Sequence, residues 1–385
     1  MKSHIFQSLP QRIVFEEKAG FKDTYGGAVG KVLLQGMLLK PDRPSDTVLV
    51  SMHPIGGTGG LPVMRYLAER GLHVLACDSR YRGADYALIM EKVVLDLGAA
   101  VRHAREKLGY KKVVLLGWSG GGSLSAFFQG EAEHPTITAT PAGDPVDIVG
   151  AGLVPADGIV FMAAHVSRHK LLTDSLDASI LDEGNPDIRD ETLDIYGTKI
   201  ARPFDAAFME RYRAAQVARM RRITAWVKAL LEELRREGRH NEEHPFIVYG
   251  TMADPRWLDP ALDPSDRRPG WTYLGDPRIV NMSPIGLGRY TSLRSWLSQW
   301  SLDDARGDGP ENLARTSVPV LVINNSADDG CAPTHARRLF EAVPHSDKVF
   351  HEIKGATHYY DGQPDLGRQA VGVVADWLHA HGFDQ

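Results

Sequence analysis

The stretch VVLLGWSGGGS, residues 113–123, joins an apolar run to a serine with glycines on both sides. The β-branched and leucine residues at 113–116 predict a buried strand, and the glycines predict a tight turn into a helix over 120–133. The stretch matches the pattern G-x-S-x-G, in which such a turn exposes a serine hydroxyl above the edge of a sheet. Two interpretations follow: Ser119 is a nucleophile, or it only caps the helix.

The regions around this turn alternate between short apolar runs and longer helical stretches. Runs typical of buried strands occupy residues 47–52, 73–79, 111–118, 158–164, 318–326 and 348–355. Helical stretches occupy residues 61–71, 85–108, 120–133, 333–342 and 365–380. Strands separated by helices of ten or more residues indicate βαβ units, so the sequence predicts an α/β fold with a mostly parallel sheet.

One long segment, residues 166–304, breaks this alternation. Acidic and proline-rich loops surround a long amphipathic helical stretch at 204–237. The last two predicted strands lie beyond this segment, so a single core is expected to be interrupted by it. We therefore expect an α/β core made of residues 1–165 and 305–385, with a large, mainly helical cap at 166–304.

Composition narrows the class of partner. The chain has 385 residues, 43% of them hydrophobic, and a formal net charge of −5, which is ordinary for a globular protein. A weakly acidic chain disfavours nucleic acid or a membrane as the main partner, so a small-molecule substrate is expected. No apolar stretch has the length of a signal peptide or a membrane span, and Cys77 and Cys331 are expected to be free thiols. These features predict a cytoplasmic protein and leave a homo-oligomer open.

Candidate partners for Ser119 follow the two last strands. Asp328 and Asp329 come after the strand at 318–326, and His358 comes after the strand at 348–355. The order serine, acid, histidine is the order of a nucleophile-elbow triad. In such a triad the histidine takes the serine proton, while the carboxylate holds the imidazole in the correct tautomer.

On these motifs, the chain resembles the α/β-hydrolase superfamily, of the serine hydrolase or esterase type with a large inserted cap. The resemblance covers roughly residues 45–165 and 315–385. It implies hydrolysis of a carboxylic ester through an acyl-enzyme on Ser119, with His358 and Asp328 as partners and no metal or organic cofactor. Asp329 remains an alternative acid. Cleavage of an amide, lactone, thioester or carbon–carbon bond, acyl transfer, and ligand binding without catalysis all remain open.

An oxyanion hole needs two N–H donors held in place beforehand. The resemblance assigns one to Gly120, directly after the nucleophile. The second is expected from the loop at 51–60, where Pro54 has no N–H to give, so Ile55 is favoured over Gly56. His53 is expected to brace this loop rather than to take part in catalysis.

The cap is expected to cover the site and to favour a bulky hydrophobic substrate. Candidate substrate-binding residues are Trp118, His165, Phe208 and Trp226, with Trp257 and Tyr273 as further cap aromatics.

Several other motifs that could indicate a different function match their patterns less well than the serine triad does. The GGTGG stretch at 56–60 matches neither nucleotide-binding pattern, and His165 with His169 lack the glutamate of a zinc helix. HNEEH at 240–244 matches an inverted zinc-protease pattern but lies between a glycine and a proline, which disfavours the helix that such a site needs. The arginines at 211–222 are expected to form a solvated helix face, and contact of one of them with a substrate carboxylate remains open.

Overall fold

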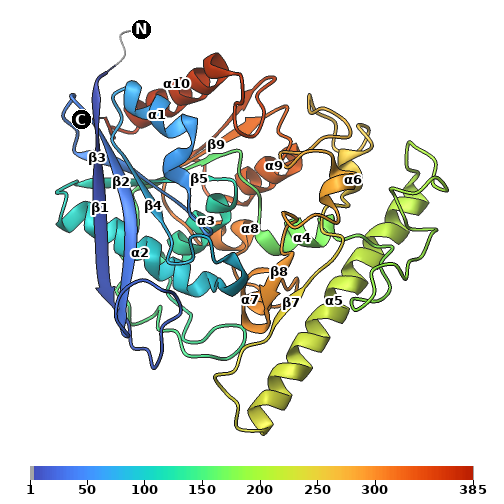
Figure 1. The fold of residues 1–385 in the computed structure, drawn as a ribbon. Coiled ribbons are helices and arrows are strands. Elements are labelled where there is room, and N and C mark those ends of the chain that lie inside the picture. Colours follow the sequence, from blue (N-terminus) through green and yellow to red (C-terminus); the bar gives the residue numbers. More distant parts are fainter. Residues whose placement is uncertain (1–3, 385) are drawn as a thin grey trace.

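The computed structural model describes residues 4–384 and contains a twisted sheet of eight strands (Figure 1). The strands lie in the order β1-β2-β4-β3-β5-β6-β9-β10. Strands β1 and β2 form an antiparallel edge, and all pairs from β4 to β10 are parallel. The strands span Phe6–Glu16 (β1), Lys31–Pro41 (β2), Thr47–His53 (β3), Val74–Asp78 (β4), Lys112–Trp118 (β5), Gly158–Met162 (β6), Val320–Asn325 (β9) and Lys348–Ile353 (β10).

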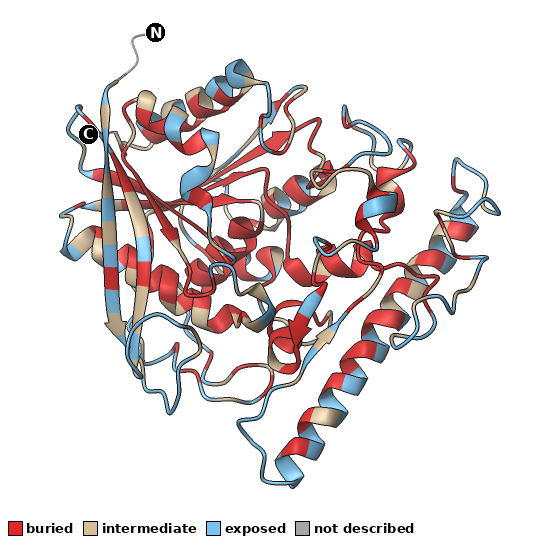
Figure 2. Ribbon diagram, viewed as in Figure 1, coloured by how far each residue is buried: buried red, intermediate tan, exposed pale blue. Residues whose placement is uncertain are grey.

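Helices cover both faces of this sheet, which explains why its central strands are mostly apolar. In β5, Val113 and Leu115 belong to the core on one face, whereas Val114 and Leu116 belong to the core on the other. The central strands are consequently buried on both sides, whereas β1 at the edge is partly exposed (Figure 2). The helices on the first face are α2 (Met90–Glu106), α3 (Gly120–Glu133), α8 (Gly309–Leu313) and α9 (Pro333–Ala342), and those on the second are α1 (Pro62–Glu69) and α10 (Pro364–Ala380).

The predicted fold class is confirmed. Each strand and helix that the sequence predicts in the core is present, with ends that differ by a few residues. The antiparallel strands β1 and β2 were not predicted. Along β1 exposed and half-buried side chains alternate around one buried residue, Ile13, and the strand contains Pro10, so it lacks the apolar run that marks the central strands.

The long insertion lies between β6 and β9, the sixth and seventh strands of the sheet in chain order. Its elements are α4 (Arg168–Ser175), α5 (Ala206–Arg236), α6 (Pro277–Val280), α7 (Leu293–Gln299) and the strand pair β7 (Pro245–Ile247) and β8 (Tyr290–Ser292). In Figure 1, α5 lies along the outside of the molecule, away from the sheet. Asp205 caps α5 by accepting the Phe208 N–H at 2.7 Å. The cap bounds of 166–304 remain a prediction.

Two apolar clusters hold the insertion together. One joins α4, α5 and α7 through side chains that include Leu172, Met220, Val227 and Trp296. The other packs the start of α5 against the loops that surround it. The buried face of α5 is therefore used to build the insertion itself.

A buried hydrogen-bond pair ties the insertion to the core. Ser298 in α7 donates to the Glu91 carboxylate at 2.7 Å and accepts the Met90 N–H at 2.7 Å, at the start of α2. Burial raises the pKa of Glu91 to about 7. A side chain of the insertion thus caps a helix of the core.

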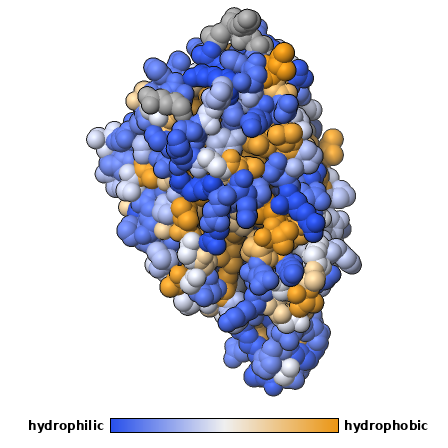
Figure 3. Space-filling model, turned by 90° about the vertical axis from the view of Figure 1, so that its left-hand side faces the viewer, coloured by the Kyte–Doolittle hydropathy of each residue, from blue (hydrophilic) through white to orange (hydrophobic). Residues whose placement is uncertain are grey.

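Among the residues that the structure describes, no helix is both long enough and apolar enough to cross a bilayer. In Figure 3 hydrophilic side chains cover most of the face in view, and apolar ones form small separate groups. Cys77 and Cys331 are both buried and free, as expected.

Candidate active site

The carboxyl ends of five adjacent parallel strands bring the candidate residues to one edge of the sheet. His53 ends β3, Ser119 follows β5, His165 follows β6, Asp328 follows β9 and His358 follows β10. Parallel strands all point the same way, so loops that follow them meet at a shared edge. Residues more than 230 positions apart in the chain thereby line one pocket.

The turn at Ser119 has a strained backbone. Ser119 has φ 52° and ψ −123°, a conformation that residues with a side chain rarely adopt. The neighbouring glycines are required by close approach: a Cβ on Gly121 would lie 2.6 Å from the Met52 carbonyl oxygen, and one on Gly117 would lie 2.7 Å from Cα of Gly122. The tight turn places the hydroxyl at the start of α3, whose N-terminus carries partial positive charge.

His358 is paired with Asp328. Nδ1 of His358 lies 2.9 Å from Oδ1 of Asp328, and the two residues are 1% and 2% exposed. The same oxygen accepts the main-chain N–H groups of Gly330 at 2.7 Å and Cys331 at 2.6 Å. A carboxylate only accepts, so Nδ1 carries the proton and Nε2 keeps its lone pair. Asp329 instead accepts the main-chain N–H of His358, at 3.3 Å, so the geometry favours Asp328 as the partner of the imidazole.

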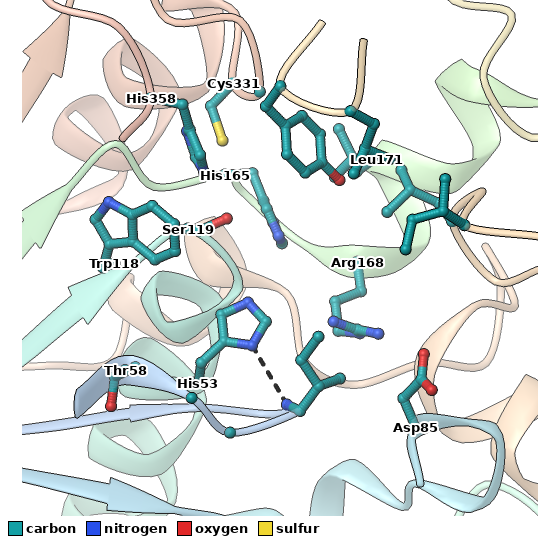
Figure 4. A pocket seen from close by; sticks show the side chains of 18 of the residues that line it. His53, Thr58, Asp85, Trp118, Ser119, His165, Arg168, Leu171, Cys331 and His358 are labelled. Atoms are coloured by element: carbon teal, nitrogen blue, oxygen red, sulfur yellow. Dashed lines mark hydrogen bonds between the residues drawn. The ribbon is translucent and has the colours of Figure 1, made fainter. Parts of the chain in front are cut away.

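Ser119 and His358 line the same cavity, which has a volume of about 510 Å³. Figure 4 shows the Ser119 hydroxyl below the His358 ring and beside Cys331. The Cys331 thiol has Ser119 as a hydrogen-bonding neighbour, and burial raises the pKa of this thiol. A thiol with a raised pKa stays protonated, so it fills space beside the serine without competing as a nucleophile.

The same residues form a possible cation-binding group. Among residues 4–384, ligand atoms of Asp328, Cys331 and His358 lie within 4.8 Å of one another. The imidazole and the carboxylate, however, are already hydrogen-bonded to each other, and the thiol is protonated. This donor set fits a hydrogen-bonded triad better than a metal centre.

Two histidine side chains lie over Gly120. A Cβ on Gly120 would be 2.7 Å from Nε2 of His53 and 3.3 Å from Nε2 of His165. Burial, with Arg168 adding to it, lowers the pKa of His53 well below its usual value, so this ring is neutral near pH 7. Its Nδ1 accepts the Ile55 N–H at 3.3 Å, the dashed line in Figure 4. The proton of the neutral ring is therefore on Nε2, the atom that lies close to Gly120.

The loop donors predicted from the sequence are therefore occupied in this structure. The Ile55 N–H is bonded to the His53 ring, and the Gly56 N–H is bonded to the His53 carbonyl at 2.8 Å. His53 braces its loop, as expected, but it also lines the pocket. The assignment of Ile55 and Gly120 as oxyanion donors stays a prediction.

The structure shows which of the predicted substrate-binding residues line the pocket, and their role in binding stays a prediction. Trp118, His165 and Tyr273 line the pocket. Phe208 and Trp226 do not, and for these two residues the expectation is corrected.

The physical reason lies in α5. Phe208 stacks on Phe204 within the insertion, with 5.1 Å between the ring centroids. Trp226 lies on the outer side of the helix, where it is 48% exposed and contacts the Phe246 ring. Trp257 is likewise buried within the insertion rather than in the pocket wall. The helical period distinguishes a buried face from an exposed one, but it does not say what the buried face packs against.

Several residues of the pocket wall were missed. They include Asp85, Cys331 and Tyr359 and, from the insertion, Arg168, Leu171, Leu274, the segment 285–288 and Trp300. Of these insertion residues, only Arg168 carried a signal, since it closely follows the strand at 158–164 and hence the functional edge of the sheet.

Two of the rival motifs, HNEEH and the arginines at 211–222, lie outside this site, whereas Gly56, Gly57 and Thr58 of the GGTGG stretch and His165 line the pocket. HNEEH occupies the loop between α5 and β7, where His244 bonds Glu242 at 3.0 Å. Exposed arginines of α5 form ion pairs with acidic side chains, as Arg221 does with Asp303 at 2.8 Å. Arg219 is buried instead and pairs with Glu183 at 2.6 Å, so the expected solvated face is corrected for this residue.

Comparison with solved structures identifies the architecture. The alpha/beta hydrolase GrgF from Penicillium sp. sh18 superposes with a TM-score of 0.52 at 14% identity, over 97% of this chain and 99% of that one. DcsB, solved in complex with its substrate analogue, superposes with a TM-score of 0.51 at 14% identity, over 98% of this chain and 99% of that one. The chain has the α/β-hydrolase fold. A monoacylglycerol lipase from Paleococcus ferrophilus is also similar, with a TM-score of 0.46 and 18% identity over 90% of this chain and 99% of that one.

The α/β-hydrolase fold confirms the resemblance stated from the motifs. No protein-family model matches the sequence, and no curated protein matches it either. Identities this low establish the fold, whereas the activity must be argued from the site.

Proposed function

We propose that this protein is a serine hydrolase that cleaves a carboxylic ester through Ser119, His358 and Asp328. One observation carries the proposal: a strained serine and a histidine that is hydrogen-bonded to a buried carboxylate line one pocket at the carboxyl edge of an α/β-hydrolase sheet. A serine hydroxyl is inert at neutral pH without a base, and the pair supplies that base.

The reaction divides into acylation and deacylation. Nε2 of His358 takes the Ser119 proton as Oγ attacks the ester carbonyl, and Asp328 stabilises the resulting imidazolium. The imidazolium then protonates the leaving alcohol, which yields an acyl-enzyme. A water molecule deprotonated by His358 attacks the acyl group, and Ser119 recovers its proton when the acid leaves.

The negative oxygen of the tetrahedral intermediate needs two donors. The Gly120 N–H, at the start of α3, is the first. For the second, the geometry favours Nε2–H of His53, which lies over Gly120 and belongs to a neutral ring. The Ile55 N–H remains the alternative, and it becomes free only if its 3.3 Å bond to the His53 ring opens.

The pocket wall supports a substrate with an apolar part. Apolar side chains contributed by the core and by the insertion are Leu61, Trp118, Leu171, Leu274, Ile285, Leu287 and Trp300. A cavity of about 510 Å³ accommodates a medium-sized acyl or alcohol group.

Labelling with a fluorophosphonate tests the nucleophile and its acid together. We expect stoichiometric labelling of the native protein, none of S119A, and labelling slowed by about 10³-fold or more in D328N, because the imidazole loses the partner that fixes its tautomer. D329N is the matched control and should react at close to the native rate. Labelling of S119A, or equal loss in the two aspartate variants, contradicts the proposed triad.

A turnover panel then tests the bond. Esters of graded acyl length are compared with amides and lactones of the same acyl groups. We expect kcat/KM to be highest for esters, and turnover of amides without esters contradicts the proposed reaction.

A further inference from the structure

Arg168 lies in the pocket wall as a buried cation without a counter-ion. It is 8% exposed, and it is the only lysine or arginine among the described residues that line the pocket. None of the ion pairs among residues 4–384 includes it. A buried charge is costly unless it is paired, so its retention here calls for a partner.

The other buried arginines of the described chain show how this protein normally satisfies such groups. Arg80 and Arg219 pair with carboxylates through their terminal nitrogens. Arg267 and Arg289 bind main-chain carbonyls with theirs. Arg168 bonds only through Nε, to Oε1 of Gln299 at 2.9 Å, and its two terminal nitrogens are left for a ligand.

The guanidinium is nevertheless held firmly. Its Cζ stacks on the Trp300 ring at 4.3 Å. Gln299, which accepts from Nε, is fixed in turn because its amide nitrogen donates to the Asp85 carbonyl at 2.9 Å and to Ser295 Oγ at 2.6 Å. The planar guanidinium is held at Nε by Gln299 and on one face by Trp300, so its two terminal nitrogens offer parallel N–H donors in a defined direction.

Arg168 is positively charged near neutral pH. Burial lowers its pKa to about 10, which still leaves the group cationic near neutral pH. Asp85 is the acidic residue of the pocket lining and acts on Arg168 through space, but the two form no ion pair. Figure 4 shows the guanidinium between His165 and Asp85, on the same pocket as Ser119.

We propose that Arg168 is the anchor for a substrate carboxylate, so that the natural substrate of the proposed esterase carries one carboxylate group in addition to the ester that Ser119 attacks. This inference rests on the proposed function. A carboxylate matches the two free donors of the guanidinium. A phosphate dianion fits less well, because the pocket offers one guanidinium and places Asp85 beside it. The apolar wall accommodates the chain between the two groups.

Kinetics with matched substrates test the anchor. The substrates are mono-p-nitrophenyl esters of adipate, pimelate and suberate, each paired with the neutral p-nitrophenyl alkanoate of the same chain length. We expect the native protein to favour one of the half-esters, and R168Q to lower kcat/KM for it by about 10- to 100-fold, mainly through KM, because hydrogen bonds to a charged group are lost. The neutral esters should change by no more than about threefold.

Two further variants separate anchoring from structure. R168K keeps the charge and should retain part of the preference. R278Q removes one exposed positive charge from α6, outside the pocket, and should leave both substrate series unchanged. An equal loss on charged and neutral esters in R168Q, or a native protein without preference for the half-esters, overturns the inference.

A binding experiment distinguishes this inference from the proposed function. Calorimetric titration of S119A with monomethyl adipate and with dimethyl adipate requires no turnover. We expect the monoanion to bind at least about tenfold more tightly, and S119A/R168Q to lose the difference. Equal binding of the two ligands to S119A overturns the anchor even if Ser119 is labelled. If S119A binds the monoanion selectively but the native protein is neither labelled at Ser119 nor active on esters, the role of Arg168 as an anchor is supported and the proposed esterase activity is rejected.

Discussion

At the scale of single residues, the contacts of His53 help to distinguish two possible arrangements of donors in the oxyanion hole. In one, the loop after β3 supplies a main-chain N–H from Ile55. In the other, that N–H fixes the tautomer of His53, and the ring supplies the donor. The bond from the Ile55 N–H to Nδ1, at 3.3 Å, belongs to the second arrangement.

Substitution of His53 tests which arrangement operates. We expect H53A to lower kcat on p-nitrophenyl hexanoate by about 10²- to 10³-fold with little change in KM, since a donor to the developing oxyanion is lost. H53Q keeps an N–H donor and should recover part of the rate. If H53A retains the native kcat while its melting temperature is unchanged, the donor is the Ile55 N–H.

At the scale of elements, the turn from β5 to α3 depends on glycines for space. Two Gly→Ala substitutions form a matched pair. In G121A the new methyl would lie 2.6 Å from the Met52 carbonyl oxygen, so we expect a loss of about 1–3 kcal/mol in unfolding free energy and slower fluorophosphonate labelling. In G372A, within α10, the methyl meets nothing within 4 Å, so we expect a gain of about 0.5–1 kcal/mol from better helix propensity. Urea unfolding measures both, and similar changes in the two variants would contradict the close packing at the turn.

The central elements were predictable because their sequences agree with their surroundings. Strands β3, β5 and β9 are buried on both faces, so they are mostly apolar, and residues of the site lie at or just after their ends. The same regularity is sufficient to predict that Ser119, Asp328 and His358 lie at one edge of the sheet.

The insertion was less predictable. The period of α5 identifies an apolar face, but that face packs against α4 and α7 rather than over the pocket. The pocket wall comes instead from α4 and from loops whose course is set by long-range contacts, such as the Tyr273 N–H bonded to the Asp329 carbonyl at 2.9 Å. Local sequence carries no signal for such contacts, so Phe208 and Trp226 were wrongly expected in the pocket.

At the scale of the whole molecule, buried neutral histidines link stability to pH. Burial lowers the pKa of His335 to about 3, and the charge of Arg256 adds to this effect while Asp254 opposes it. Nδ1 of His335 accepts the Val166 N–H at 3.3 Å, and Nε2 is buried without a partner. The unfolded chain, with a pKa near 6.5, takes up the proton first as the pH falls. Stability is therefore fully present above about pH 6.5 and is lost below it.

Comparison of the native protein with H335N isolates this effect. Asn retains an acceptor for the Val166 N–H but does not titrate. Between pH 6.5 and pH 5.5, we expect the native protein to lose up to about 1.4 kcal/mol more unfolding free energy than H335N, as measured by urea denaturation. Glu91, whose raised pKa acts in the opposite direction, is present in both proteins and cancels. Parallel pH profiles would contradict the buried neutral state of His335.

Through the bonds between Ser298 and the start of α2, the inserted segment completes the hydrogen bonding of the core. Excision of that segment would remove the one hydroxyl that bonds both the Met90 amide and the Glu91 carboxylate. An insertion taken from another protein of the same fold would therefore have to supply a hydroxyl group at the position of Ser298.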